Sequence, residues 1–156
     1  MKHIPQNLER LGLFLPAPKP ALASYAPFTL SAGLLHVSGQ GPVDGDGTAI
    51  TGTSGADLDL ETAHMAARLC AVNILAQVQQ ALEGDWSRLR RCLKLNGFVN
   101  ATADFTQHPQ IINGASDLIG DVLGDSGRHA RSAVGVASLP LGWAVEIDAL
   151  FEVRCD

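Results

Sequence analysis

Cysteine, aromatic side chains and charge are all scarce in this 156-residue sequence. The three cysteines, Cys70, Cys92 and Cys155, form no CxxC pair, which argues against a disulfide framework and against a zinc site. Charged residues make up 17% of the chain and aromatic residues 5%, whereas 46% of it is hydrophobic. This composition is typical of one globular domain with reduced thiols, so we expect a cytoplasmic protein.

Long basic runs and long apolar runs are missing as well. The longest basic run is the pair Arg90–Arg91, and the formal net charge is −5. Nucleic-acid-binding surfaces are usually basic, so this balance disfavours a nucleic-acid partner. The apolar run Leu11–Leu15 is shorter than the roughly 7–15 residues of a secretory signal. No stretch reaches the roughly 20 apolar residues of a membrane span, so we expect no membrane association.

Motifs for metal binding and for hydrolase triads are also lacking. No two of the five histidines have the helical spacing and the neighbouring ligands of a metal site. The loop DGDGTAITGTSG lacks the ligand spacing of a calcium-binding loop and is typical of a solvated turn. Neither Ser38 nor Ser132 has the His and Asp neighbours of a catalytic triad. We therefore expect no metal site.

What the sequence does contain is an alternation of strand and helix patterns after a short arm. Residues 1–24 are predicted to form an N-terminal arm, with a helix at Gln6–Leu13 and a Pro-rich connector. Residues 25–156 form the domain. Its predicted elements are strands at Phe28–Ser31 and Leu34–Ser38, a short strand at Ala49–Gly52, a helix from Asp59 to Gly84, a strand at Arg90–Thr102, a helix at His108–Gly124, and two strands within Arg128–Val153.

This β-β-α-β-α-β-β order predicts an α+β domain with two helices on one face of a largely antiparallel sheet. The last two strands are joined by the turn SLPLG, and we expect them to pair as a hairpin. Alternation gathers the apolar residues of the last strand on one face; these are Trp143, Val145, Ile147, Ala149, Phe151 and Val153.

Two charged residues lie within this predicted hairpin. If Val134 joins the apolar face of the last strand, Arg131 falls on the opposite face, together with Glu146 and Asp148. A register slip of one residue would exchange the faces. Two interpretations remain open, namely a structural cross-strand ion pair and an arginine that anchors the carboxylate of a ligand. The residue pattern alone favours the ion pair.

Several motifs resemble those of a known family. The segments SGQGPVDGDG, ARSAVGV and LPLGWAVEI, together with YAPFTLSAGLLHVSGQ, are similar to the RidA/YjgF (reactive intermediate deaminase) family, which is also labelled endoribonuclease L-PSP. The resemblance extends from Tyr25 to Val153 and points to a divergent YjgF-like branch. It implies a chorismate-mutase-like α+β single domain that forms homotrimers, with ligands bound in clefts between subunits.

The resemblance also implies roles for particular residues. Arg131 would clamp the carboxylate of a small metabolite, Glu146 would orient the water that attacks an imine carbon, and Tyr25 would frame the imine. The remaining substrate-binding positions carried over from the family are Ser38, Gly39, Asn113 and Ala133. Imine hydrolysis requires no metal or organic cofactor, so none is expected.

Three functions follow from this resemblance. The first is hydrolytic deamination of small enamines and imines, the second is a non-catalytic regulatory trimer that binds small carboxylates, and the third is an endoribonuclease. Many family members carry cysteine where this chain has Ala133, which separates the chain from those members and keeps the second function open. The negative net charge disfavours the third function.

Overall fold

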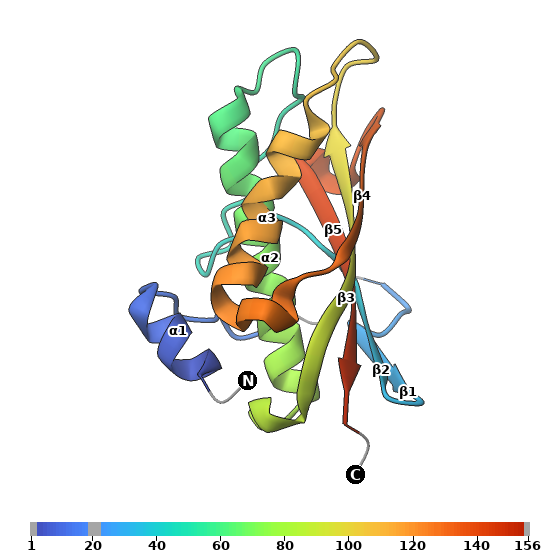
Figure 1. Cartoon of the computed structure of the whole chain (residues 1–156). Coiled ribbons are helices and arrows are strands. Elements are labelled where there is room, and N and C mark those ends of the chain that lie inside the picture. The colour runs from blue at the N-terminus through green and yellow to red at the C-terminus, as the bar shows by residue number, and fades with distance from the viewer. Residues whose placement is uncertain (1–2, 19–22, 155–156) are drawn as a thin grey trace.

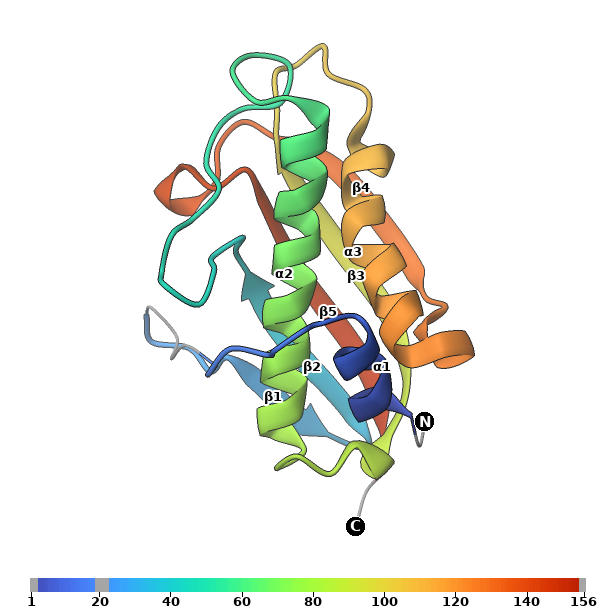
Figure 2. The same cartoon turned by 90° about the vertical axis from the view of Figure 1, so that its left-hand side faces the viewer.

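A five-stranded sheet carries two long helices on one of its faces (Figures 1 and 2). The computed structural model describes residues 3–18 and 23–154. Residues 19–22, which belong to the predicted connector, and Cys155 lie outside the described residues. The layered arrangement confirms the predicted α+β class with both helices on the same side of the sheet.

The strand order across the sheet is β1-β2-β5-β3-β4. The strands are β1 (Phe28–Ser31), β2 (Leu34–Gln40), β3 (Leu89–Asn100), β4 (Ala130–Val136) and β5 (Val145–Val153). Neighbouring strands are antiparallel except β3 and β4, which are parallel. The first hairpin is confirmed, and Ala32 and Gly33 form its two-residue turn with φ values of 50° and 77°.

Local signals set the limits of the two long helices. Helix α2 (Leu60–Ala81) begins where the Asp59 side chain accepts a hydrogen bond of 2.8 Å from the backbone N–H of Thr62. Helix α3 (His108–Leu123) has a proline in its first turn and ends at Gly124, with φ 61°. Both helices lie within the segments predicted for them, because the capping residues and the apolar stripe of each helix indicate the same limits.

The core lies between the sheet and these helices. Leu95, Val99, Ile147 and Phe151 of the sheet are fully buried against α2 and α3. Helix α1 (Ile4–Arg10) lies on this assembly through the buried Ile4 and Leu8, and the Asn7 side chain donates a 3.0 Å hydrogen bond to the carbonyl of Val122 at the end of α3. The arm is therefore held by the fold, and its helix lies slightly earlier than predicted. No described helix is long and apolar enough to cross a membrane.

The predicted hairpin of the last two strands is wrong. Strand β5 lies between β2 and β3, whereas β4 is the outer neighbour of β3 on its other side. The unit β3–α3–β4 is a parallel crossover, in which the connecting helix returns the chain to the start of the next strand. Alternation in a strand predicts which residues share a face, but it does not predict which strand is the neighbour. The segment 49–52, predicted as a strand, makes isolated bridges instead.

Candidate functional site

Arg131 lies on the face of β4 that the helices cover. In the parallel register it pairs with Leu95, and Ala133 pairs with Gly97. Leu95 is fully buried beneath the helices, so its partners on the same face point toward α3. A side-chain carbon at Gly97 would come within 2.5 Å of Ile112 on α3, which shows how closely the helix approaches this part of the sheet.

The guanidinium of Arg131 is held by neutral acceptors from α3. Its Nη1 donates to Asn113 Oδ1 at 2.8 Å and to Ser116 Oγ at 3.1 Å, and Nη2 makes a long contact of 3.5 Å with the carbonyl oxygen of Pro109. None of these partners is a carboxylate. Within the described part of the chain, the positive charge of Arg131 is therefore oriented by hydrogen bonds without being neutralised.

His129 extends this group by one further hydrogen bond. Its Nδ1 faces the carbonyl of Gly127, and because a carbonyl only accepts, Nδ1 carries the proton. The Nε2 atom then accepts from the hydroxyl of Ser116 at 3.0 Å, while Ser116 Oγ accepts from Arg131. These residues line a shallow hollow of about 420 Å³ at the edge of the sheet. His129 thus lies at the rim of the arginine site.

Glu146 lies on the opposite face of the sheet from Arg131. It pairs with Phe98, which is three residues beyond Leu95 in a regular part of β3, so the two strand positions point to opposite sides. The predicted shared surface, and with it the ion pair within one chain, is therefore wrong. The register argument assumed that Val134 is in the core, but Val134 is 46% exposed on the outer face.

The reason for this register lies in the close approach of α3 to β4. A side-chain carbon at Gly135 would come within 2.5 Å of His108 Nε2 on α3. The helix therefore requires the row of small residues, Ala133 and Gly135, beneath it, and the branched Val134 is turned outward. Arg131 lies at the end of β4 before these small residues, on the same face, and its long side chain reaches the side chain of Asn113 on α3.

Glu146 is half-buried beside the end of β2. Its carboxylate contacts the position where a Gly39 side chain would lie, so a glycine is required there. Burial, followed by the negative charge of Asp148, raises the pKa of Glu146 above its ordinary value. Asp148 itself accepts a 2.7 Å hydrogen bond from Asn96. A carboxylate with a raised pKa accepts a proton more readily than an ordinary glutamate does.

The residues Tyr25, Ser38 and Gly39 belong to the same end of the sheet as Glu146. Ser38 Oγ donates to the carbonyl of Ala26 at 2.7 Å, and the backbone N–H of Ser38 donates to Pro27 at 3.0 Å. These bonds hold the segment that carries Tyr25 against β2. Tyr25 is 51% exposed, and it lines one pocket together with Gly39.

The predicted site residues therefore form two separate groups. Tyr25, Ser38, Gly39 and Glu146 lie at β2 and β5, whereas Asn113, Arg131 and Ala133 lie at β4 and α3. In the strand order, β4 lies two strand spacings from β5 and three from β2, so roughly 10–14 Å separates the two groups, and Glu146 also lies on the opposite face of the sheet from Arg131. One small ligand cannot contact both groups of the same chain.

Sequence reasoning missed two residues that shape these groups. Ser116 follows Asn113 by three residues on α3, so helical periodicity could have placed both on one face. Asn73 on α2 binds the backbone of the loop after β2. No local signal identifies this second contact, because its two ends are about 30 residues apart.

The described residues contain neither a reactive thiol nor a cluster of potential metal ligands. Burial raises the pKa of Cys92 to about 12 and the pKa of Cys70 well above its ordinary value, so both thiols stay protonated. Nowhere in residues 3–18 or 23–154 do three His, Cys, Asp or Glu side chains gather as metal ligands.

Comparisons with known proteins agree with this architecture. The family model described as "YjgF/chorismate_mutase-like, putative endoribonuclease" matches residues 6–151. Protein TCP17 of Trypanosoma cruzi is 49% identical over 149 residues, which cover 95% of this chain and 92% of that protein.

Two solved structures are also similar. Atu1372 of Agrobacterium tumefaciens, a protein of unknown function, is 52% identical with a TM-score of 0.89, covering 98% of this chain and 95% of that chain. A "putative endoribonuclease" from Shewanella oneidensis is 32% identical with a TM-score of 0.91, covering 96% and 99%. The chain thus belongs to the YjgF/chorismate mutase-like family.

Proposed function

We propose that this protein hydrolyses small 2-imino acids, and the enamines in equilibrium with them, to keto acids in clefts between the subunits of a homotrimer. The observation that carries the proposal is the guanidinium of Arg131, which neutral groups orient and no described carboxylate neutralises. A cation held in this way is suited to binding the carboxylate of a small metabolite.

Glu146 supplies the proton transfers in this proposal. Water attacks the imine carbon, a C–O bond forms, and Glu146 accepts the proton that the water loses. Glu146 returns this proton to the nitrogen, which gives a carbinolamine. It then takes the proton of the new hydroxyl group and passes it to the nitrogen as the C–N bond breaks and the carbonyl forms, which releases ammonia and the keto acid. The raised pKa of Glu146 supports this role, because a carboxylate whose pKa lies above the ordinary value is a stronger base than an ordinary glutamate.

A second subunit accounts for the separation of the two groups. Arg131 of one subunit and Glu146 of the next would meet in one cleft, with Tyr25 and the Ser38–Gly39 segment framing the imine. The outer sheet face supports such an assembly, because it carries Phe98, Val134 and Leu150, and these are at best partly buried in a single chain.

The first test measures turnover of 2-iminopropionate, with pyruvate detected by coupled reduction. We expect Arg131→Ala to lower kcat/KM by about 100-fold or more, because a charged hydrogen-bonded anchor is lost. Arg90→Ala is the matched control, since Arg90 is an exposed arginine of β3 that does not line the hollow around Arg131, and its activity should be unchanged. Pyruvate binding without any turnover would instead assign the protein as a carboxylate-binding trimer.

Subunit mixing tests the shared cleft directly. Arg131→Ala and Glu146→Gln subunits are each expected to be inactive, and the two are unfolded and refolded together. If one residue of each cleft comes from each of two neighbours, random mixing restores about a quarter of the sites. Mixed samples that stay inactive, although each variant alone folds and assembles, would show that the two residues do not share a site.

A further inference from the structure

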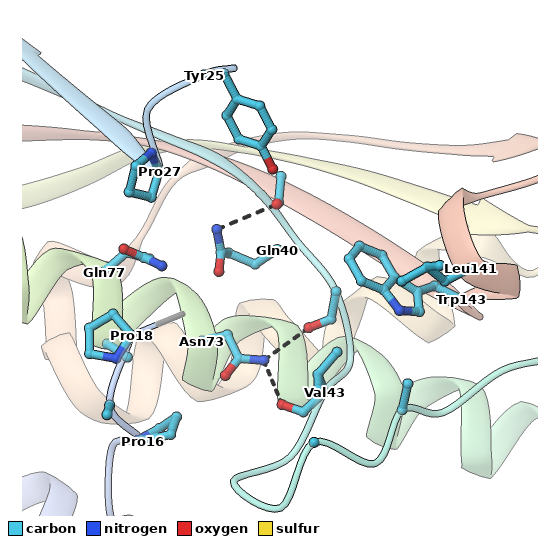
Figure 3. Close-up of a pocket in the computed structure, with 16 residues that line it drawn as sticks. Pro16, Pro18, Tyr25, Pro27, Gln40, Val43, Asn73, Gln77, Leu141 and Trp143 are labelled. Atoms are coloured by element: carbon cyan, nitrogen blue, oxygen red, sulfur yellow. Dashed lines mark hydrogen bonds between the residues drawn. The ribbon is translucent and has the colours of Figure 1, made fainter. Parts of the chain in front are cut away.

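A second pocket lies on the helix side of β2, away from Arg131. It encloses about 290 Å³ between the segment Pro16–Pro18 of the arm, the Gly39–Gly41 end of β2, helix α2 and Trp143 (Figure 3). The arm can form one wall because α1 is fixed on α3 by Asn7 and by buried apolar residues. The volume is near the lower limit of about 300 Å³ for small-molecule sites.

The chemistry of this pocket differs from that of the arginine site. Of the described residues that line it, none carries a charged side chain, and neither Arg131 nor Glu146 is among them. Proline rings of the arm and the indole of Trp143 provide apolar walls. Binding a carboxylate here would remove its hydration without an ion pair to offset the free-energy cost. The ligand of this pocket is therefore expected to be neutral.

Two side-chain amides fix the polar groups of the pocket. Asn73 Nδ2 uses both hydrogens, donating to the carbonyls of Gly41 at 2.9 Å and Val43 at 2.8 Å. Gln40 Nε2 donates to the carbonyl of Ser38 at 3.0 Å. The amide orientations are thus determined, and Figure 3 shows the side-chain oxygens of Asn73 and Gln40 directed away from these bonds, toward the side where Pro18 lies. Both oxygens can only accept hydrogen bonds.

The position of Trp143 is set by the backbone of β2. A side-chain carbon at Gly41 would come within 2.6 Å of the indole ring, so the ring packs directly on this glycine. A flat aromatic wall of this kind favours a flat aromatic ligand, which can stack on it.

We propose that this pocket binds a neutral, planar heteroaromatic molecule of one or two fused rings that donates N–H hydrogen bonds to Gln40 Oε1 and Asn73 Oδ1. The volume of the pocket limits the ligand to one or two rings. The flat indole of Trp143 favours a planar ligand, and the two oriented acceptors, Gln40 Oε1 and Asn73 Oδ1, favour a ligand with N–H donors. Tyr25 and Gly39 line this pocket and also belong to the proposed deamination site, but Arg131 and Glu146 do not line it, so ligand binding here can be measured separately from turnover.

Adenine is the probe for this site, because it is neutral, planar and rich in N–H donors. In ¹H–¹⁵N spectra of the full chain we expect adenine to shift the indole N–H signal of Trp143 and the side-chain amide signals of Gln40 and Asn73, while Trp86 stays unchanged. 6-(Dimethylamino)-9-methylpurine, which has the same rings without N–H donors, should bind at least about tenfold more weakly, as expected for the loss of hydrogen bonds.

Two variants locate the binding. Ala76→Leu places a larger side chain into the pocket from α2, where Ala76 is 2% exposed, and should abolish adenine binding. Gln79→Leu adds the same side chain at an exposed position of the same helix and should bind normally. The Arg131→Ala variant should also bind adenine normally.

Three results would overturn the proposal. The first is the absence of shifts at Trp143 and Gln40 at millimolar adenine, and the second is equal binding by the donor-free purine. The third is displacement of adenine by pyruvate together with its loss in Arg131→Ala, which would locate adenine in the arginine site. Because the readout is binding, it stays informative even if the protein turns out to have no deaminase activity.

Discussion

At the scale of single residues, Glu146 combines a proposed catalytic role with a cost in stability. Its pKa is higher in the folded chain than its ordinary value, because burial and Asp148 disfavour the charged form. The folded state therefore binds more protons than the unfolded state between the ordinary pKa, near 4.5, and the raised one. Stability falls as the pH rises through this window, and the loss is complete above it.

Glu146→Gln removes this cost, since glutamine stays neutral. We expect the variant to be inactive and to have a higher melting temperature than the wild type at pH 7. The difference should shrink as the pH falls below 4.5, and it should stay below about 1 kcal/mol because the side chain is half exposed. Thermal melts at several pH values measure this, and Asp46→Asn serves as a control at an exposed position of the loop. A difference that does not depend on pH would contradict the assignment.

At the scale of elements, the packing of α3 positions Arg131. Asn113 and Ser116 approach the guanidinium only because α3 lies close to both the sheet and α2. At Gly114 a side-chain carbon would contact the backbone carbonyl of His64 on α2, so this helix pair has no room for a methyl group. The distance between the helices therefore depends on one glycine.

Gly114→Ala should destabilise the chain by about 1–3 kcal/mol, the usual cost of overpacking, and should raise the KM of the proposed reaction because Asn113 moves with the helix. Gly120→Ala is the matched control on the same helix, where an added carbon meets nothing within 4 Å. That change should stabilise the chain by about 0.5–1 kcal/mol through higher helix propensity. Denaturant unfolding of both variants gives the comparison, and equal stabilities would refute the packing argument.

The elements themselves were largely predictable from the sequence, because their signals are local. Asp59 and Gly84 delimit α2, and the Ala32–Gly33 turn delimits the first hairpin. The neighbour of β4 was not predictable from alternation, although the helix between β3 and β4 is typical of a parallel pair. The face of β4 that carries Arg131 was predicted wrongly for a related reason. The branched Val134 suggested a core position, whereas the close approach of α3 requires the small residues Ala133 and Gly135 on the core side.

At the scale of the whole molecule, the predicted site residues do not all meet in one chain. Asn113 and Arg131 lie together in one chain, joined by a hydrogen bond of 2.8 Å, but Glu146 and Tyr25 belong to the other group, at least two strands away. Side-chain alternation in one sequence carries no information about contacts between chains. Only the family resemblance indicated a site between subunits.

Val134→Lys tests the assembly at this scale. Val134 lies on the outer sheet face and is 46% exposed, so lysine is accommodated in an isolated chain but places a charge in the proposed interface. Light scattering should show a trimer for the wild type and a monomer for the variant, with loss of activity. Met65→Lys, at a 57% exposed position of α2, should stay trimeric and active. A fully active Val134→Lys monomer would exclude a cleft between subunits.

The close contacts of α3 also constrain how the sequence can change during evolution. Gly97 lies under Ile112, Gly135 under His108 and Gly114 against the backbone of His64. Relatives that keep an arginine at the position of Arg131 should therefore retain glycine at the position of Gly114, where the opposing group is backbone. At Gly97 and Gly135 a larger residue should appear only together with a smaller residue at its partner on α3, so that these positions covary in pairs.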